Sequence, residues 1–309
     1  MPSKLLFARI NLSPTLDDYV EGANKLDIEK KRLLKVISWD TDILKEITGP
    51  GKSSVNIKNV EWKFGGVQEG EDYIYGRIAK CKGHIASIAD NKAKDFKTEY
   101  LREAFVCNFL IDLRNHVFVY ESKKNVGEKA PLWIISGTYN GHYGSDRMKL
   151  NPITDRRKIT QRINELSVIT SIKMSLVPTN PDMTPSSAKM DTLIRDLRAN
   201  RVTIEATSGR GLNLTGEDGL LSSGLALAEE GYGSAKVIGL KTTGDGLQKE
   251  EVINSYNLPV KEKVELDQND DENITRLKDK ISSVISILKE PIPREVPTPP
   301  ESTTINKSP

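Results

Sequence analysis

The spacing of apolar residues changes repeatedly between residues 167 and 242, and few folds can accommodate such a stretch. Apolar residues at every second position indicate strands with one buried face, and apolar residues three or four positions apart indicate helices. Two successive strand–helix–strand steps favour crossover connections and an open sheet covered by helices. The spacing predicts strand, helix, strand, helix and strand, in that order, at residues 168–176, 184–200, 202–207, 220–230 and 235–240.

The first of these helices follows a turn that contains two prolines. Thr184 is a favourable N-cap, and Pro185 suits the first helical position. The apolar residues after them form one stripe at helical spacing. We expect this stripe to pack against the sheet through Met190, Leu193, Ile194 and Leu197.

The second helix is rich in small residues, which allow a close approach of backbone to backbone. A glycine-rich segment at residues 231–233 ends it. The strand that follows, residues 235–240, is apolar on both faces, which predicts an interior position in the sheet.

The first half of the chain has the pattern of an antiparallel β meander with one or two helices. A helix is expected from Asp27, extending as far as Ile47, before a glycine- and proline-containing turn. The predicted strands, including a hairpin around residues 113–115, cover residues 4–12, 60–64, 72–82, 104–112, 116–121 and 132–136.

Two further helices flank the central stretch. One is predicted from Asn151 to Leu166, and an amphipathic one from Asn269 to Leu288. The segment after Lys289 is rich in proline, serine and threonine, and we expect it to be disordered. The predicted class is α+β, with a β-rich half (1–150), an α/β unit (151–258), an amphipathic helix (259–290) and a tail (291–309).

The composition is that of an ordinary globular protein, with 37% hydrophobic and 28% charged residues. No run of about 18 apolar residues is present, so membrane insertion is not expected. The N-terminal residues lack the pattern of a signal peptide, and two cysteines do not make a disulfide framework. These features favour a cytoplasmic location.

Charge is unevenly distributed along the chain. Residues 141–213 hold 12 Lys and Arg against 7 Asp and Glu, whereas residues 214–309 hold 11 against 17. Convergent cations of this kind are what phosphate neutralisation requires, although a solvated helix face gives the same pattern. The candidate nucleic-acid-binding residues are Arg147, Lys149, Arg156, Arg157, Lys158, Arg162, Arg195, Arg198, Arg201 and Arg210.

Other motifs give weaker signals, and no catalytic or metal-binding residue and no cofactor is predicted from them. The segment Gly49–Ser53 resembles the end of a phosphate-binding loop but follows a helix instead of a strand. Asp112 with the Glu-Ser-Lys segment at 121–123 resembles a nuclease metal site, but the predicted hairpin holds the carboxylates more than about 10 Å apart. Cys81 and His84 have metal-like spacing, yet two ligands do not make a zinc site.

Several short segments within residues 60–258 resemble a bacterial family found mainly in phage-defence and mobile-element neighbourhoods. They are Phe105–Asp112 with the hairpin strand Val117–Glu121, the strand end at Pro178 with Asn180-Pro181-Asp182, the helix end Leu193–Asn200, Ser223–Leu225 and Gly231–Ala235. The resemblance implies an antiviral role and a cytoplasmic location, and it carries over no catalytic residue. More distantly, the chain is similar to phage-exclusion proteins that bind DNA without catalysing a reaction.

Three functions follow as hypotheses. The first is a defence protein that binds nucleic acid, with DNA as the expected form, as a non-enzymatic sensor or accessory subunit. The second is a metal-dependent nuclease. The third is a protein-interaction module that binds a co-encoded defence protein through the predicted helix Asn269–Leu288. A homo-oligomer is compatible with each of them.

Overall fold

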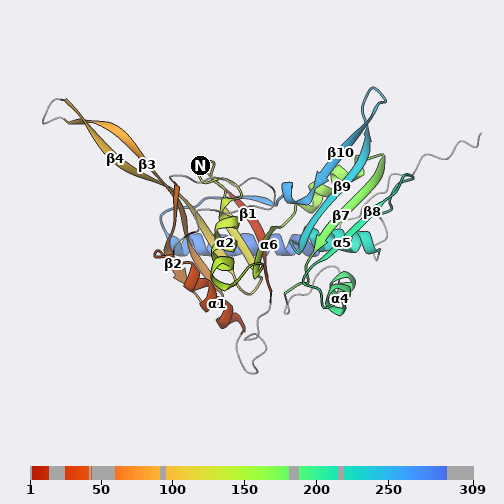
Figure 1. Cartoon of the computed structure of the whole chain (residues 1–309), viewed down its shortest axis with the longest axis horizontal. Coiled ribbons are helices and arrows are strands. Elements are labelled where there is room, and N and C mark those ends of the chain that lie inside the picture. Colours follow the sequence, from red (N-terminus) through yellow and green to blue (C-terminus); the bar gives the residue numbers. More distant parts are fainter. Residues whose placement is uncertain are drawn as a thin grey trace, which may run out of the picture. The chain divides into compact units, whose positions relative to one another are not determined.

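The computed structural model describes residues 2–13, 25–41, 43, 60–90, 95–180, 188–214 and 219–290, with the backbone alone for 84–90 and 95–100. The chain forms two compact units, and each is described by itself (Figure 1). Unit 1 comprises Met1–Pro152 and Lys261–Val284. Unit 2 comprises Ile153–Val260 and Ile285–Pro309. The predicted α+β class is confirmed.

Unit 1 is built on a seven-stranded sheet in which all neighbouring strands are antiparallel. Its order is β11-β1-β5-β4-β3-β2, and β6 pairs with β1 beyond the end of β11. The predicted hairpin around residues 113–115 is confirmed as β4–β5. The strands are β1 (Ser3–Leu12), β2 (Val60–Glu69), β3 (Tyr73–Asp90), β4 (Asp95–Asp112), β5 (Val117–Glu121), β6 (Met148–Pro152) and β11 (Lys261–Val264).

Helices α1 (Lys25–Val36) and α2 (Ala130–Tyr143) cover one face of this sheet and share a single apolar core with it. The predicted strand at 132–136 is wrong, because these residues lie inside α2, whose first turn contains Pro131. Leu132, Ile134 and Ile135 are all buried, and so short an apolar run fits a buried helix as well as a strand. Helix α1 ends at Val36 and does not extend to Ile47.

Helix α6 (Asp270–Lys289) lies on the other face of the sheet (Figure 1). Its Ile274, Leu277 and Ile281 are buried, as are Leu5 and Phe7 of β1, which alternate with the residues that face α1 and α2. The hydroxyl of Tyr75 donates a hydrogen bond to Asp270 at 3.0 Å and fixes the start of the helix. Unit 1 is therefore a sheet between two helical layers.

Unit 2 has a four-stranded sheet of order β10-β9-β7-β8. Of the two predicted crossover connections, the first is wrong, because β8 pairs antiparallel with β7. The second is confirmed: β8 and β9 are both antiparallel to β7 and so run parallel to each other, and the connection through α5 crosses over β7. The predicted interior position of the strand at 235–240 is confirmed, since β9 lies between β7 and β10. The strands are β7 (Val168–Leu176), β8 (Val202–Thr207), β9 (Gly233–Thr242) and β10 (Gln248–Asn254), and a short 3-10 helix (Ser255–Asn257) follows.

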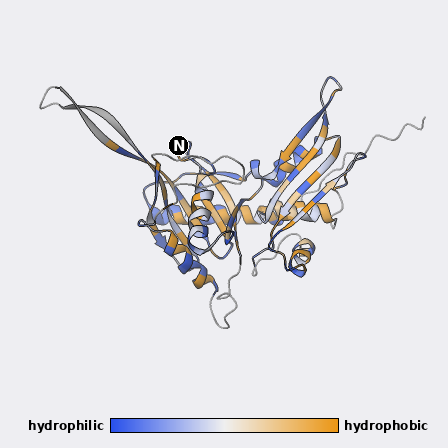
Figure 2. Cartoon of the chain, viewed as in Figure 1, coloured by the Kyte–Doolittle hydropathy of each residue, from blue (hydrophilic) through white to orange (hydrophobic). Residues whose placement is uncertain are grey.

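One face of this sheet is covered by helices α3 (Arg156–Asn164), α4 (Ala188–Asp196) and α5 (Leu220–Glu229). Helix α5 approaches β7 closely at Gly224, where an added Cβ would lie 2.8 Å from Cε of Met174. The predicted role of small residues in α5 is thus confirmed. Hydrophobic and hydrophilic residues alternate along the strands (Figure 2). Among the described residues of unit 2, no helix covers the opposite face of the sheet.

Two helix predictions in unit 2 need correction. Helix α3 begins at Arg156 instead of Asn151, because residues 148–152 form β6 and the Asp155 side chain accepts a hydrogen bond from the Lys158 amide, as an N-cap does. Helix α4 ends at Asp196 and turns Met190, Asp191 and Ile194 inward. Leu193 and Leu197 are 42% and 60% exposed, so they do not pack on the sheet as predicted.

Some predictions fall outside the described residues. They include the cap at Thr184 and Pro185, the loop-like segment Gly49–Ser53 and the tail after residue 290. Within the described residues, no helix combines the length and the apolar character that spanning a membrane would require.

Candidate nucleic-acid interface

The uncovered face of the unit 2 sheet is a polar surface formed by alternate residues of four strands. Cross-strand register places Asn254, Lys236, Lys173 and Glu205 in one row. The neighbouring rows hold small hydroxyl residues and two aliphatic ones. We call this surface the open face, and its residues are Ser171, Lys173, Ser175, Thr203, Glu205, Thr207, Ser234, Lys236, Ile238, Leu240, Glu250, Val252 and Asn254.

Two lysines lie directly opposite each other in the centre of the open face. Lys173 of β7 pairs in register with Lys236 of β9, and both are exposed. Like charges in directly opposite positions of an antiparallel sheet are destabilising. Glu205 of β8 offsets the charge of Lys173 at 2.7 Å, and no carboxylate in the described part of the chain pairs with Lys236. An excess of positive charge therefore remains between β7 and β9.

Three of the ten predicted cations are exposed and lie in the segments that precede or follow β8. Arg201 directly precedes β8, Arg210 follows it, and Arg198 lies in the turn after α4 with a φ of 49°. Among the described residues, none of the three forms an ion pair with a carboxylate. Arg201 continues the alternation of Thr203 and Glu205, so it extends the open face at the start of β8.

The four predicted cations of α3 are engaged within unit 2. The side chain of Arg156 is largely covered: its Nε lies 3.2 Å from the fully buried carboxylate of Glu229, and its guanidinium also donates to the carbonyl of Leu288. The other three pair with carboxylates at 3.8, 2.7 and 2.6 Å, in the pairs Arg157–Glu290, Lys158–Asp155 and Arg162–Glu251. The helix therefore offers a phosphate much less free charge than its composition suggests.

Arg195 of α4 is also committed to its own unit. Its Nε donates to Asp191 at 2.6 Å, and its Nη2 donates to the carbonyl and hydroxyl oxygens of Thr179 at 2.6 and 2.8 Å. Helix α4 packs on α5, whereas α3 contacts β10. Arg195 and the four cations of α3 are therefore all held in contacts within unit 2.

The remaining two candidates belong to unit 1. Arg147 is half-buried just before β6, and Lys149 on β6 pairs with Asp146 at 3.5 Å. The ten predicted cations thus do not form a single patch on one unit.

The acidic residues of the β4–β5 hairpin have separate structural partners. Asp112 accepts two hydrogen bonds at 2.8 Å from the amide and side chain of Asn115. Glu121 accepts from the hydroxyl of Ser3 and from Asn108, and it pairs with Lys123 at 3.2 Å. In the described part of the chain, no three His, Cys, Asp or Glu side chains are grouped so that they could hold a metal ion.

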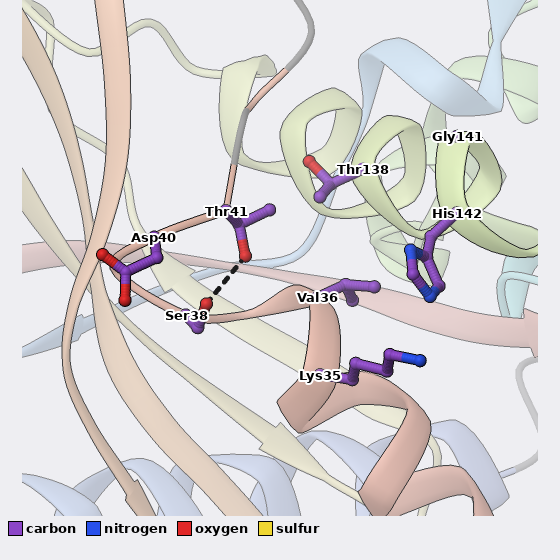
Figure 3. A pocket seen from close by; sticks show the side chains of 8 residues that line it. All are labelled: Lys35, Val36, Ser38, Asp40, Thr41, Thr138, Gly141 and His142. Carbon is purple, nitrogen blue, oxygen red and sulfur yellow. Dashed lines mark hydrogen bonds between the residues drawn. The ribbon is translucent and has the colours of Figure 1, made fainter.

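Unit 1 contains a cavity of about 390 Å³ between the last turns of α1 and α2 (Figure 3). Lys35 and His142 lie at one end, Asp40 lies at the other, and Ser38 and Thr41 bond to each other between them. Lys35 and Asp40 carry opposite charges. The cavity therefore has no net charge of one sign that would select a ligand.

The open face was only partly visible in the sequence. Alternation in residues 168–176 shows that Lys173 lies on a polar face, but the sequence of β9 is apolar on both faces because Ile238 and Leu240 follow Lys236 at alternate positions. In the structure Lys236 is exposed and Ile238 is half-buried. The cross-strand lysine pair could not be predicted, because it depends on the antiparallel register of β7 and β9, which the pattern of the separate strands does not determine.

A comparison with curated proteins found no match. A comparison with protein families matched residues 50–282 to a family described as a domain of unknown function, DUF4747. The match covers most of the chain and parts of both units. The chain therefore belongs to the DUF4747 family.

Proposed function

We propose that the protein binds nucleic acid across the open face of unit 2 and acts without catalysis, as a sensor or accessory subunit. The cross-strand pair of Lys173 and Lys236 carries this proposal. Two lysines in directly opposite positions repel, and a phosphate bound by both turns that repulsion into two favourable contacts. Arg201 adds a third cation at the start of β8.

The hydroxyl and amide side chains of the open face fit a nucleic-acid backbone. Serine and threonine hydroxyls and the Asn254 amide are donors that commonly contact phosphate and sugar oxygens. None of the residues assigned to the open face is aromatic, so bases have no ring to stack on. Contact through phosphates alone predicts binding that depends strongly on salt and little on sequence.

The biological setting in the proposal comes from the resemblance described above. It assigns the protein to defence against phage, with DNA as the nucleic acid and a co-encoded defence protein as a further partner. The alternative of a protein-interaction module that works through α6 is less well supported, because Ile274, Leu277 and Ile281 already pack within unit 1. The alternative of a metal-dependent nuclease has no acidic site to support it among the described residues.

The test is a double substitution, Arg201→Ala with Lys236→Ala, in the full-length protein. Both side chains are exposed, so the free energy of unfolding should change by less than about 0.5 kcal/mol for each. Affinity for duplex and single-stranded DNA should fall about equally for unrelated sequences. The slope of log affinity against log salt should become shallower by about 0.7–0.9 for each phosphate that the variant no longer neutralises. Fluorescence anisotropy at several salt concentrations measures both quantities.

A matched control removes two cations that already have carboxylate partners, Lys158→Ala with Lys241→Ala. It lowers the net charge by the same amount and should leave the salt slope unchanged. Glu205→Gln should strengthen binding, because it removes the one carboxylate in the lysine row. Equal losses of affinity in test and control variants, or unaltered binding in the folded test variant, would exclude the open face as the binding surface.

A further inference from the structure

Strands β3 and β4 form a ribbon that extends far beyond the rest of the unit 1 sheet (Figure 1). Strand β2 pairs with β3 only as far as Lys82, and β5 pairs with β4 only from Phe109 onward. From Gly83 to Asp90 the two strands pair with each other, and no third strand in the described part of the chain joins them. We call this two-stranded segment the ribbon.

A two-stranded ribbon by itself is marginally stable in water, and three or more strands with an apolar face are needed. The register pairs Ile85 with Tyr100 and Ala89 with Phe96, and these four residues share one face of the ribbon with the small pair Ser87 and Thr98 between them. The ribbon therefore has a largely apolar face. Within the described part of the chain, no third strand pairs with either of its edges.

The two outer edges of the ribbon differ in charge. On β4, Lys97, Glu99 and Arg102 recur along the edge, which is how natural proteins protect exposed edge strands from pairing. On β3, residues 83–89 read Gly-His-Ile-Ala-Ser-Ile-Ala, without a lysine, arginine, aspartate or glutamate. The β3 edge is thus the one suited to accept another strand.

We propose that two copies of the chain pair antiparallel through the β3 edges of their ribbons and form a four-stranded sheet. A closed two-fold dimer is the commonest homo-oligomer, and its interface must be complementary to itself. With the two-fold axis at Ser87, His84 lies opposite Asp90 of the second copy. Each isoleucine of the segment then lies opposite an alanine, since Ile85 meets Ala89 and Ala86 meets Ile88.

The sequence of this segment favours another copy of the same chain as the partner of the β3 edge. The segment pairs a hydrogen-bond donor, His84, with an acceptor, Asp90, and each isoleucine with an alanine, and pairing raises the strand number from two to four. It is also independent of the open face, which belongs to unit 2. The failure of either proposal would leave the other standing.

The first experiment measures molar mass by light scattering coupled to size exclusion. The full-length protein at micromolar concentration should have twice the chain mass of 34.4 kDa. Ser87→Lys places two like charges opposite each other at the axis and should restore the single-chain mass. Thr98→Lys is the matched control, because Thr98 pairs with Ser87 but lies on the other edge, and it should leave the dimer intact.

The second experiment keeps the proposal testable if Ser87→Lys fails to fold. Ser87→Cys and Thr98→Cys are made in a Cys81→Ser background, which removes the half-buried thiol of Cys81. Cys107 is buried and is left unchanged. Directly opposite residues of antiparallel strands have Cα atoms about 4.5–5.5 Å apart, which suits a disulfide. Mild oxidation should yield a covalent dimer for Ser87→Cys alone. A single-chain mass for the unmodified protein, or equal cross-linking by both variants, would overturn the proposal.

Discussion

Arg156 and Arg157 are neighbours in the sequence, yet their environments differ completely. The side chain of Arg156 is 10% exposed and faces Glu229, which is fully buried, whereas the side chain of Arg157 is 75% exposed. The sequence marks both only as cations of a basic helix. The partner of Arg156 is 73 residues away, and only the packing of α3 near the end of α5 brings the two together. Such a pairing cannot be predicted from local spacing.

Substitution of Arg156 should therefore affect folding before it affects binding. Arg156→Ala leaves the Glu229 carboxylate buried without this partner, and breaking a buried pair in this way typically costs about 3–5 kcal/mol. Arg157→Ala is the matched control and should change the free energy of unfolding by less than about 0.5 kcal/mol. Chemical denaturation of both variants gives the two values. Equal stability would show that the Arg156–Glu229 pair does not hold α3 in place.

Helix α6 is held to unit 1 by polar contacts as well as by its apolar face. Lys278 donates to the Asp72 carboxylate at 2.8 Å, and its ammonium group lies 4.2 Å from the centre of the Tyr73 ring. The hydrogen bond from Lys278 holds the pKa of Asp72 below its usual value of 3.8, against the opposing effect of burial. The contact therefore stabilises the helix only while the carboxylate is ionised.

The pH dependence of stability follows from the sign of this shift. A lowered pKa in the folded state adds stability above the unfolded value, and this contribution is lost as the pH falls below about 3.8. Lys278→Met should raise the pKa of Asp72 and make stability fall less between pH 7 and about pH 2.5. Urea unfolding at both pH values measures the difference. Lys289→Met, at the exposed end of α6, should retain the wild-type dependence.

Most elements could be predicted from periodicity, but their partners and orientations could not. Alternation located β7 and β8, and helical spacing located α5 and α6, because each has one clearly apolar face. Helix α4 was placed but wrongly rotated, since the hydrogen bond from the Thr179 amide to Asp191 turns that polar residue inward. Of the proposed site, the charge of the middle segment was visible, whereas the pairing of Lys173 with Lys236 depends on register.

The two units are not consecutive in the chain. Unit 1 takes its first 152 residues from the N-terminal half and is completed by Lys261–Val284, after the chain has passed through unit 2. Strand β11 pairs with β1, and α6 covers the face to which Leu5 and Phe7 belong. The integrity of unit 1 therefore depends on residues near the other end of the chain.

Truncation after Val260 should unfold unit 1. It removes β11 and α6 and exposes apolar side chains that include Leu5, Phe7 and Val119, so we expect dye binding to exposed apolar surface and loss of the cooperative thermal transition. Truncation after Glu290 keeps every described residue and should leave the melting temperature within about 2 °C. A cooperative transition that persists in the shorter protein would show that the sheet folds without its α6 layer.

The place of β11 and α6 in the chain also determines when unit 1 can form during synthesis. Strand β1 leaves the ribosome among the first residues, but its partner β11 is made roughly 250 residues later. At about 5–20 residues per second, the wait is roughly 10–50 s. During that time α6 does not yet cover its apolar face of the sheet. The β3 edge of the ribbon, which has no charged residue at positions 83–89, is present on every nascent chain. Neighbouring ribosomes on one message would bring such edges together, so the order of translation favours early chaperone binding or assembly before release.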